Sequence, residues 1–422
     1  MMFFSPGGFS IITSKVIDPP PLVLSLPEWR AEGLTVSSIF VLLRFIEGGS
    51  IIINTYFRLT IVIITFNPKE YPMPATTNKK EAWSRIFTAA EKIRQMKPWR
   101  WMHETDIFGI KIPGTNTIFF ISVMGTLGEV TAITAYRGER ALQMFWELQE
   151  EDTAYLTSSF TAASRILTIP QIMLNFEEEK NLEPEEIRRI KNRGGKPSKD
   201  KIWPLLEQYV PGFVPGEPDE QALNDAAIIL EQCPYVFEQA REDEDFIYPE
   251  DDDENRYLIR EIKSATGKEW KNEYKNVWAE PLNYKIHFPL IHLNRLKNRQ
   301  KKQETLQIDL AMLPSPVKEG DIKPYYPFVL LLVNKKTGII QDFDMLSPLP
   351  DLNTMYESIP EKLLDMFLES NSAPAQVEMR SEILITLLTQ LLDRAGIILK
   401  RPDHMKAMDG AIAGMVSQMG KR

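Results

Sequence analysis

The sequence is poor in the residues that build disulfides and zinc sites. Its 422 residues include one cysteine, Cys233, and four histidines. A single thiol cannot form an intramolecular disulfide, which is typical of a protein kept in a reducing cytoplasm. Structural zinc sites need several cysteine and histidine ligands. We therefore expect a cytoplasmic protein with no metal site and no bound cofactor.

Recognisable catalytic motifs are also missing. There is no glycine-rich nucleotide fingerprint, no GxSxG elbow, no HExxH and no CxxC pair. Gly125 and Gly128 resemble part of a phosphate-binding loop, but a strand is expected after them where such a loop needs a helix. His287 and His292 are five residues apart, the wrong phase for a metal pair on a helix. The sequence therefore predicts no catalytic residue and favours a protein that is not an enzyme.

Long apolar runs and excess positive charge are absent as well. Residues 37–66 are the most apolar, but Arg44, Glu47 and Arg58 interrupt them before the roughly 20 apolar residues that a spanning helix needs. The net charge is −9, whereas binding to phosphates relies on clustered lysine and arginine. We expect no membrane partner, and nucleic acid is only weakly favoured as a partner.

The distribution of charge divides the chain. Residues 1–72 have about half the charge density of the rest, and two interpretations are open: an added β-rich layer, or upstream sequence translated ahead of a start at Met73. The second is favoured. After it, the sequence predicts an N-terminal α+β domain over residues 73–292 with a helical second half, a basic linker over 293–302, and a C-terminal α/β domain over 303–422.

The N-terminal domain is predicted to be a helix followed by an antiparallel meander. Apolar residues recur every three or four positions over residues 79–95, which indicates an amphipathic helix. Three apolar runs separated by turn residues then favour a meander. The strands and the helix that closes them are expected at residues 107–112, 117–124, 130–136 and 139–150.

The second half of this domain is predicted to be helical. Residues 218–240 have helical periodicity, and Pro234 should kink or end the helix. Trp270, Tyr274 and Trp278 recur every four residues, which favours one face of another helix.

The C-terminal domain is predicted to be a mixed α/β domain that contains a hairpin. Residues 328–333 and 338–343 are apolar runs around a turn closed by Gly338, and we expect them to form the central pair of a sheet. Residues 358–361 have the pattern of a capping box with Pro360 in the first helical turn. A terminal β-α-β unit is expected from the elements at residues 375–379, 381–396 and 397–399.

Two stretches carry candidate binding residues. Residues 188–201 hold seven basic side chains and one acidic one, which favours contact with an anion or nucleic acid, although a solvated loop has the same composition. Trp99 and Trp101 could stack on a base or a sugar, but tryptophans in a small α+β domain also pack in cores. The candidate anion contacts are Arg188, Arg189, Lys191, Arg193, Lys196 and Arg380.

Several strings resemble a set of uncharacterised bacterial proteins. The first are PWRWM, DIFGIK and SVMGTLGEVTAITAYRG, within residues 97–148, and IWPLLEQYVPGFVP continues the similarity. KPYYPFVLLLVNKKTGII resembles the C-terminal domain of the same proteins. Both halves are domains of unknown function. The resemblance therefore implies a bacterial two-domain protein and brings no activity with it.

The order of elements in the C-terminal domain also resembles the ribonuclease H-like fold of nucleases and integrases. In that family, an aspartate at the end of the first strand and another after a later strand hold divalent metal ions for phosphoryl transfer. We interpret the matching positions as Asn334 and Arg380. Neither side chain can bridge a metal ion, so the resemblance implies a non-catalytic version of the fold.

Three functional hypotheses follow. The leading one is a non-catalytic binding or interaction protein, with another protein as the partner. The second is a nucleic-acid-associated protein with a degenerate ribonuclease H-like domain. The third is an unrecognised enzyme with a site between its domains.

Overall fold

The computed structural model describes residues 78–126, 128, 130–150, 164–251, 253–263, 269–370 and 373–419, and two short strands near the N-terminus. The chain divides into two compact units, Met1–Asn67 and Pro68–Arg422. In the first unit, the described residues are β1 (Leu22–Val23) and β2 (Leu42–Leu43), which pair in antiparallel fashion. The remainder of the predicted extension 1–72, and Met73, lie outside the described residues.

The N-terminal half of the second unit is built on a seven-stranded sheet with the order β7-β6-β5-β4-β3-β8-β9. The predicted meander is confirmed as β3-β4-β5, and β6 and β7 extend it in antiparallel fashion. β8 joins the other side of β3 in parallel. The strands are β3 (Phe108–Lys111), β4 (Ile118–Met124), β5 (Ala132–Arg137), β6 (Gln171–Glu178), β7 (Ile202–Tyr209), β8 (Arg256–Ile262) and β9 (Trp270–Asn276).

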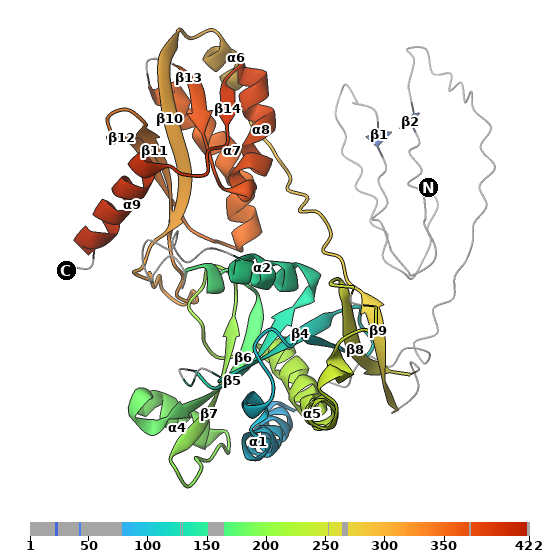
Figure 1. Cartoon of the computed structure of the whole chain (residues 1–422). Helices are drawn as coiled ribbons and strands as arrows, with labels where there is room; N and C mark the ends of the chain where they lie inside the picture. The colour runs from blue at the N-terminus through green and yellow to red at the C-terminus, as the bar shows by residue number, and fades with distance from the viewer. Residues whose placement is uncertain are drawn as a thin grey trace. The chain divides into compact units, whose positions relative to one another are not determined.

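Helices cover both faces of this sheet (Figure 1). α1 (Lys79–Met96) and α5 (Glu220–Glu242) pack together over one face, where their apolar sides join the largest core. α2 (Gly138–Glu150) covers part of the other face, and α4 (Pro184–Asn192) packs beside β7. The predicted cap of α1 is confirmed, because the Asn78 side chain accepts a hydrogen bond from the Lys80 backbone N–H.

The helix predicted over residues 218–240 is confirmed as α5, which begins after its Asp219 cap. It does not end at Pro234 but continues for two further turns, because residues on both sides of the proline are buried in the same core. The prediction of a second helix is wrong. Trp270 and Tyr274 lie on strand β9, not on a helix. A spacing of four residues also keeps side chains on one face of a strand, so the pattern could not separate the two structures. Trp278 follows the strand and is 65% exposed.

The C-terminal half contains a five-stranded sheet with the order β12-β11-β10-β13-β14. The predicted hairpin is confirmed as β11-β12, and the terminal unit as the parallel pair β13 and β14 joined by a helix. The hairpin is not the central pair, however, because β10 is the middle strand and β12 is an edge. The strands are β10 (Lys301–Met312), β11 (Phe328–Asn334), β12 (Ile340–Leu346), β13 (Ala373–Glu378) and β14 (Ile398–Lys400).

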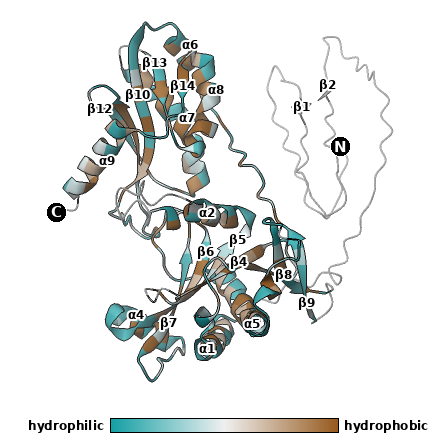
Figure 2. Cartoon of the chain, viewed as in Figure 1, coloured by the Kyte–Doolittle hydropathy of each residue, from teal (hydrophilic) through white to brown (hydrophobic). Residues whose placement is uncertain are grey.

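One face of this sheet is covered by three helices and the other by one. α6 (Leu290–Lys297), α7 (Leu352–Glu369) and α8 (Glu382–Ala395) enclose the main core. α9 (Lys406–Met419) packs on the opposite face against β10 and β11. Figure 2 shows apolar and polar residues alternating along α8, as expected for a helix with one buried side. Among the described residues, no helix is long and apolar enough to cross a membrane.

Local predictions for the C-terminal helices were partly wrong. α8 has the predicted Ser381 cap and ends at Gly396, which adopts a left-handed conformation (φ 66°). α7 begins earlier than predicted, at an Asp351 cap, so Pro360 lies inside the helix and not in its first turn. The residues of the predicted linker 293–302 form most of α6 and the first residues of β10.

Candidate functional site

The predicted basic segment begins on a helix and not in a loop. Arg188 and Arg189 lie on α4, where each faces a glutamate one turn earlier, at 2.8 Å for Arg188 and 3.8 Å for Arg189. These are i, i+3 pairs of the kind that stabilise a helix surface. Lys191 lies over the ring of Trp203, 5.3 Å from its centroid, and Lys196 is exposed. Much of the positive charge of α4 therefore contacts glutamates and a tryptophan of the protein itself.

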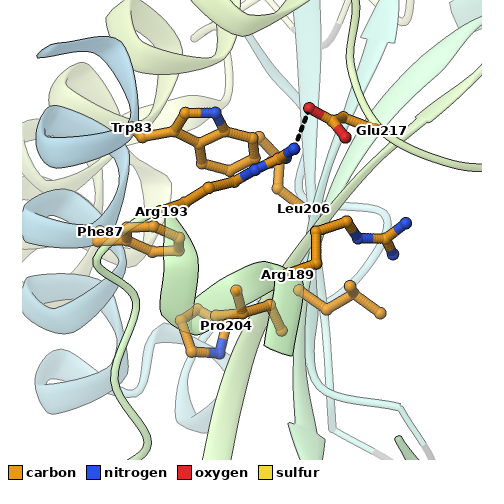
Figure 3. Close-up of a pocket in the computed structure, with 9 residues that line it drawn as sticks. Trp83, Phe87, Arg189, Arg193, Pro204, Leu206 and Glu217 are labelled. Atoms are coloured by element: carbon orange, nitrogen blue, oxygen red, sulfur yellow. Dashed lines mark ion pairs between the residues drawn. The ribbon is translucent and has the colours of Figure 1, made fainter. Parts of the chain in front are cut away.

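Arg193 lines a small pocket with Arg189 (Figure 3). Its guanidinium lies over the ring of Trp83, 4.8 Å from the centroid, and forms an ion pair with Glu217. The pocket has room for only about 10 Å³, roughly one water molecule. This arrangement fixes the end of α4 against α1, and the pocket is too small for a nucleotide or a sugar.

The two candidate stacking residues pack against the protein itself. Trp99 contacts the ring of Phe176 at 5.5 Å between centroids. Trp101 is covered by the guanidinium of Arg241 at 5.2 Å, and its indole N–H is buried without an acceptor in the described part of the chain. Both rings also pack on the core beneath α1 and α5. A stacking role for them stays a prediction.

A cluster of buried polar side chains lies between the C-terminal sheet and α9. Residues alternate along β10, so Leu306 and Ile308 face the core of α7 and α8, whereas Gln307 and Asp309 face α9. Glu378, at the end of β13, joins them, and all three polar residues are less than 10% exposed. Arg380 and Asp409 complete what we call the β10 cluster: Gln307, Asp309, Glu378, Arg380 and Asp409.

Arg380 connects the sheet to α9 through two carboxylates. Its Nε and Nη2 donate to Oδ2 of Asp309 at 3.1 and 2.9 Å, and its Nη1 donates to Oδ1 of Asp409 at 2.6 Å. Burial would lower the pKa of Arg380, but the charges of Asp309 and Asp409 outweigh it and raise that pKa. Burial raises the pKa of Asp309, while Arg380 opposes the shift. The arginine stays charged and occupies the space between the two acids.

The remaining acid of the cluster is neutralised from another side. Oε2 of Glu378 accepts from the Gln307 amide at 3.0 Å, and Oε1 accepts from Lys335 Nζ at 2.6 Å. Burial would raise the pKa of Glu378, but these two donors outweigh it and lower that pKa. The Gln307 side-chain oxygen accepts from the Met408 backbone N–H at 3.0 Å, which ties the cluster to α9 a second time.

Our assignment of Asn334 to the position of the first metal-binding aspartate of the ribonuclease H-like fold was wrong. Asn334 ends β11, the second strand of the sheet, and its side-chain oxygen accepts from the backbone N–H groups of Lys336 and Thr337 in the hairpin turn. β10 is the first and central strand, and Asp309 is the buried acid on it. The sequence does contain a signal for Asp309, an aspartate in the middle of an otherwise apolar alternating run, but our prediction overlooked it.

Beside the cluster, the surface has an open depression of about 440 Å³. It lies where β13 and β14 end and α8 begins, and two arginines and two acidic residues are among the residues that line it. Among the described residues, no group of three or more acids, histidines or cysteines is arranged to hold a metal ion. The residues that line the depression are Arg380, Glu382, Ile385, Arg401, Pro402 and Asp403.

Comparison with protein-family models assigns both halves of the chain. Residues 83–260 match a domain of unknown function (DUF7309), and residues 292–416 match another (DUF6930). The chain carries two domains of unknown function. This confirms the predicted resemblance, and the β10 cluster falls within the DUF6930 match. Comparison with curated proteins and with solved structures found no match.

Proposed function

We propose that this protein is a non-catalytic interaction protein, and that its DUF6930 half binds a partner. The observation that carries the proposal is the guanidinium of Arg380, held between the carboxylates of Asp309 and Asp409. Arginine keeps its charge at any physiological pH, so it repels a divalent cation from these acids. With Glu378 bound by Gln307 and Lys335, the acids of the cluster serve to hold the domain together.

The edge strand β12 is the surface best suited to a partner. Phe343 and Met345 are 59% and 48% exposed, and they pair with Leu331 and Val329, which belong to the core under α9. Proteins often protect an edge strand with lysine or proline, and residues 340–346 contain neither. The outer backbone of β12 can therefore accept an added strand.

The charge of β12 indicates which strand would be added. If the β12 strands of two copies paired in antiparallel fashion around residue 342, 343 or 344, Asp342 or Asp344 would lie opposite an aspartate of the second copy. Like charges opposite each other destabilise a pair of strands. A segment with alternating apolar and basic residues meets the exposed Phe343 and Met345 side chains. Its basic residues meet Asp342, since Asp344 already pairs with Lys362 at 2.7 Å. We propose such an extended segment of another protein as the partner.

Co-purification with matched variants tests this proposal. The full chain, Phe343→Asp and Ile398→Asp are used as baits in cell extract, with Ile398 as the control because it is 60% exposed at the opposite edge of the same sheet. A partner should be retained by the wild type and by Ile398→Asp and be lost with Phe343→Asp. Equal retention by both variants would refute binding at β12.

The nucleic-acid alternative has less support from the contacts. Arg188, Arg189 and Arg193 are each paired with a glutamate, and Arg380 is paired twice within the β10 cluster. If this alternative holds, an electrophoretic assay at low salt should show a shifted band that disappears steeply as salt rises.

A further inference from the structure

Arg260 on β8 is a buried cation with no acidic partner. It is 9% exposed, and it is the one basic residue among the buried residues of the described chain. It lies next to α5, on the same face of the sheet as Leu258, which belongs to the main core. A buried charge is costly unless it is paired. The groups around Arg260 therefore indicate its role.

Neutral groups hold the guanidinium in a fixed orientation. Its Nε donates to the side-chain oxygen of Gln232 on α5 at 3.0 Å, and its Nη1 donates to that of Asn272 on β9 at 3.0 Å. The rings of Tyr235 and Trp270 lie 4.8 and 5.6 Å from the guanidinium carbon. The amides and rings position the group without cancelling its charge.

Acids in the neighbourhood are already engaged elsewhere. On α5, Glu231 forms an ion pair with Arg85 at 2.6 Å, and Glu238 forms one with Lys92 at 3.2 Å. No described acid lies within ion-pair distance of Arg260, and burial lowers its pKa, as expected for a cation without a counter-charge. This differs from the β10 cluster, where each buried charge has a partner.

One nitrogen of the guanidinium remains available. In the described part of the chain, Nη2 of Arg260 has no hydrogen-bond acceptor, and it is not among the buried unpaired atoms, so it is reachable from solvent. Tyr235 beside it is 52% exposed. Lys92 Nζ lies 5.4 Å from the Tyr235 ring, but its charge is paired with Glu238 at 3.2 Å. Arg260 therefore supplies the unpaired charge.

We propose that Arg260 is an anion-binding site, with its free Nη2 hydrogen-bonded to an oxyanion of the phosphate type and with Tyr235 beside the bound group. With Nε and Nη1 already donating to Gln232 and Asn272, Nη2 is the donor left for the anion, and the permanent guanidinium charge strengthens that hydrogen bond. Arg260 and Tyr235 lie within the DUF7309 match, whereas Trp270 and Asn272 lie just beyond its end, and the existence of the site does not depend on partner binding at β12.

Calorimetric titration of the full chain tests the site directly. Inorganic phosphate and adenosine monophosphate are titrated separately at constant ionic strength into the wild type, Arg260→Met, Arg260→Lys and Arg241→Met. Arg241 is the control because it also stacks on a tryptophan, Trp101, at 5.2 Å. Circular dichroism verifies that each variant is folded.

The wild type and Arg241→Met should bind phosphate saturably, and Arg260→Met should not bind it. Arg260→Lys keeps the charge but loses the planar guanidinium that Gln232 and Asn272 orient, so its affinity should fall by about tenfold. Tighter binding of the nucleotide would identify a nucleotide as the source of the anion through stacking on Tyr235, and equal affinity would assign recognition to the phosphate alone. The proposal is overturned if neither anion binds the wild type, or if Arg260→Met binds as well as the wild type does.

Discussion

Removing the Arg380 side-chain charge should destabilise the C-terminal domain, because it leaves the buried Asp309 without its partner. In Arg380→Met, Asp309 stays 7% exposed and loses two hydrogen bonds, at 2.9 and 3.1 Å. Breaking a buried ion pair costs about 3–5 kcal/mol. Because the Arg380 side chain is 35% exposed, water replaces part of the interaction, and we expect a loss of about 2–3 kcal/mol in unfolding free energy.

A double variant distinguishes the loss of the Asp309–Arg380 ion pair from the loss of Arg380 packing. Asp309→Asn combined with Arg380→Met removes the charges of the buried pair and leaves Asp409, whose side chain is 30% exposed, without its partner. It should recover about half of the loss, since no fully buried charge is left uncompensated. Arg401→Met is the control in the same depression. It lies 3.8 Å from Glu382 and is 57% exposed, so it should change the unfolding free energy by less than about 0.5 kcal/mol.

The assay must report on the C-terminal half. All eight tryptophans lie at or before Trp278, so tryptophan fluorescence follows the other half. Urea unfolding is therefore followed by circular dichroism, together with hydrogen exchange of peptides from β10 and α9. If Arg380→Met unfolds like Arg401→Met, and exchange in α9 is unchanged, the reasoning about the β10 cluster is refuted.

Two further outcomes are expected in the same domain. Because the folded state lowers the pKa of Glu378, this carboxylate stabilises the fold above its unfolded pKa of about 4.5, and the stabilisation is lost as pH falls through the folded pKa. Glu378→Gln should therefore cost about 1 kcal/mol of unfolding free energy at pH 7 and show a shallower loss of stability in acid. An unchanged acid profile in urea unfolding would contradict this. Phe343→Asp should leave the unfolding free energy within about 0.5 kcal/mol of the wild type, and a larger drop would show that this residue serves stability and not partner binding.

Local elements of the fold could be predicted where one short-range rule applied. The caps at Asn78 and Ser381, the glycine end at Gly396 and the hairpin around Gly338 depend on neighbouring residues alone. These rules failed where packing against the core determined the extent of a helix. Pro234 and Pro360 lie inside helices because both are buried against a core that offsets the missing hydrogen bond.

The candidate sites were harder to predict, because they depend on pairing between distant segments. Asp309 and Arg380 are 71 residues apart and meet only because β10 and β13 are neighbours in parallel. Once the hairpin was taken as the centre of the sheet, Asn334 was placed where Asp309 belongs. Arg260 gave no sequence signal at all, since its lack of an acidic partner becomes visible only when α5 and β9 are in place.

The central claim is that the acids of the β10 cluster hold the domain together and carry out no metal-dependent chemistry. The most direct measurement is hydrolysis of labelled single- and double-stranded DNA and RNA by the full chain with Mg²⁺ or Mn²⁺. The account predicts no hydrolysis above the level of folded Asp309→Asn. Metal-dependent hydrolysis by the wild type that disappears in Asp309→Asn would contradict it.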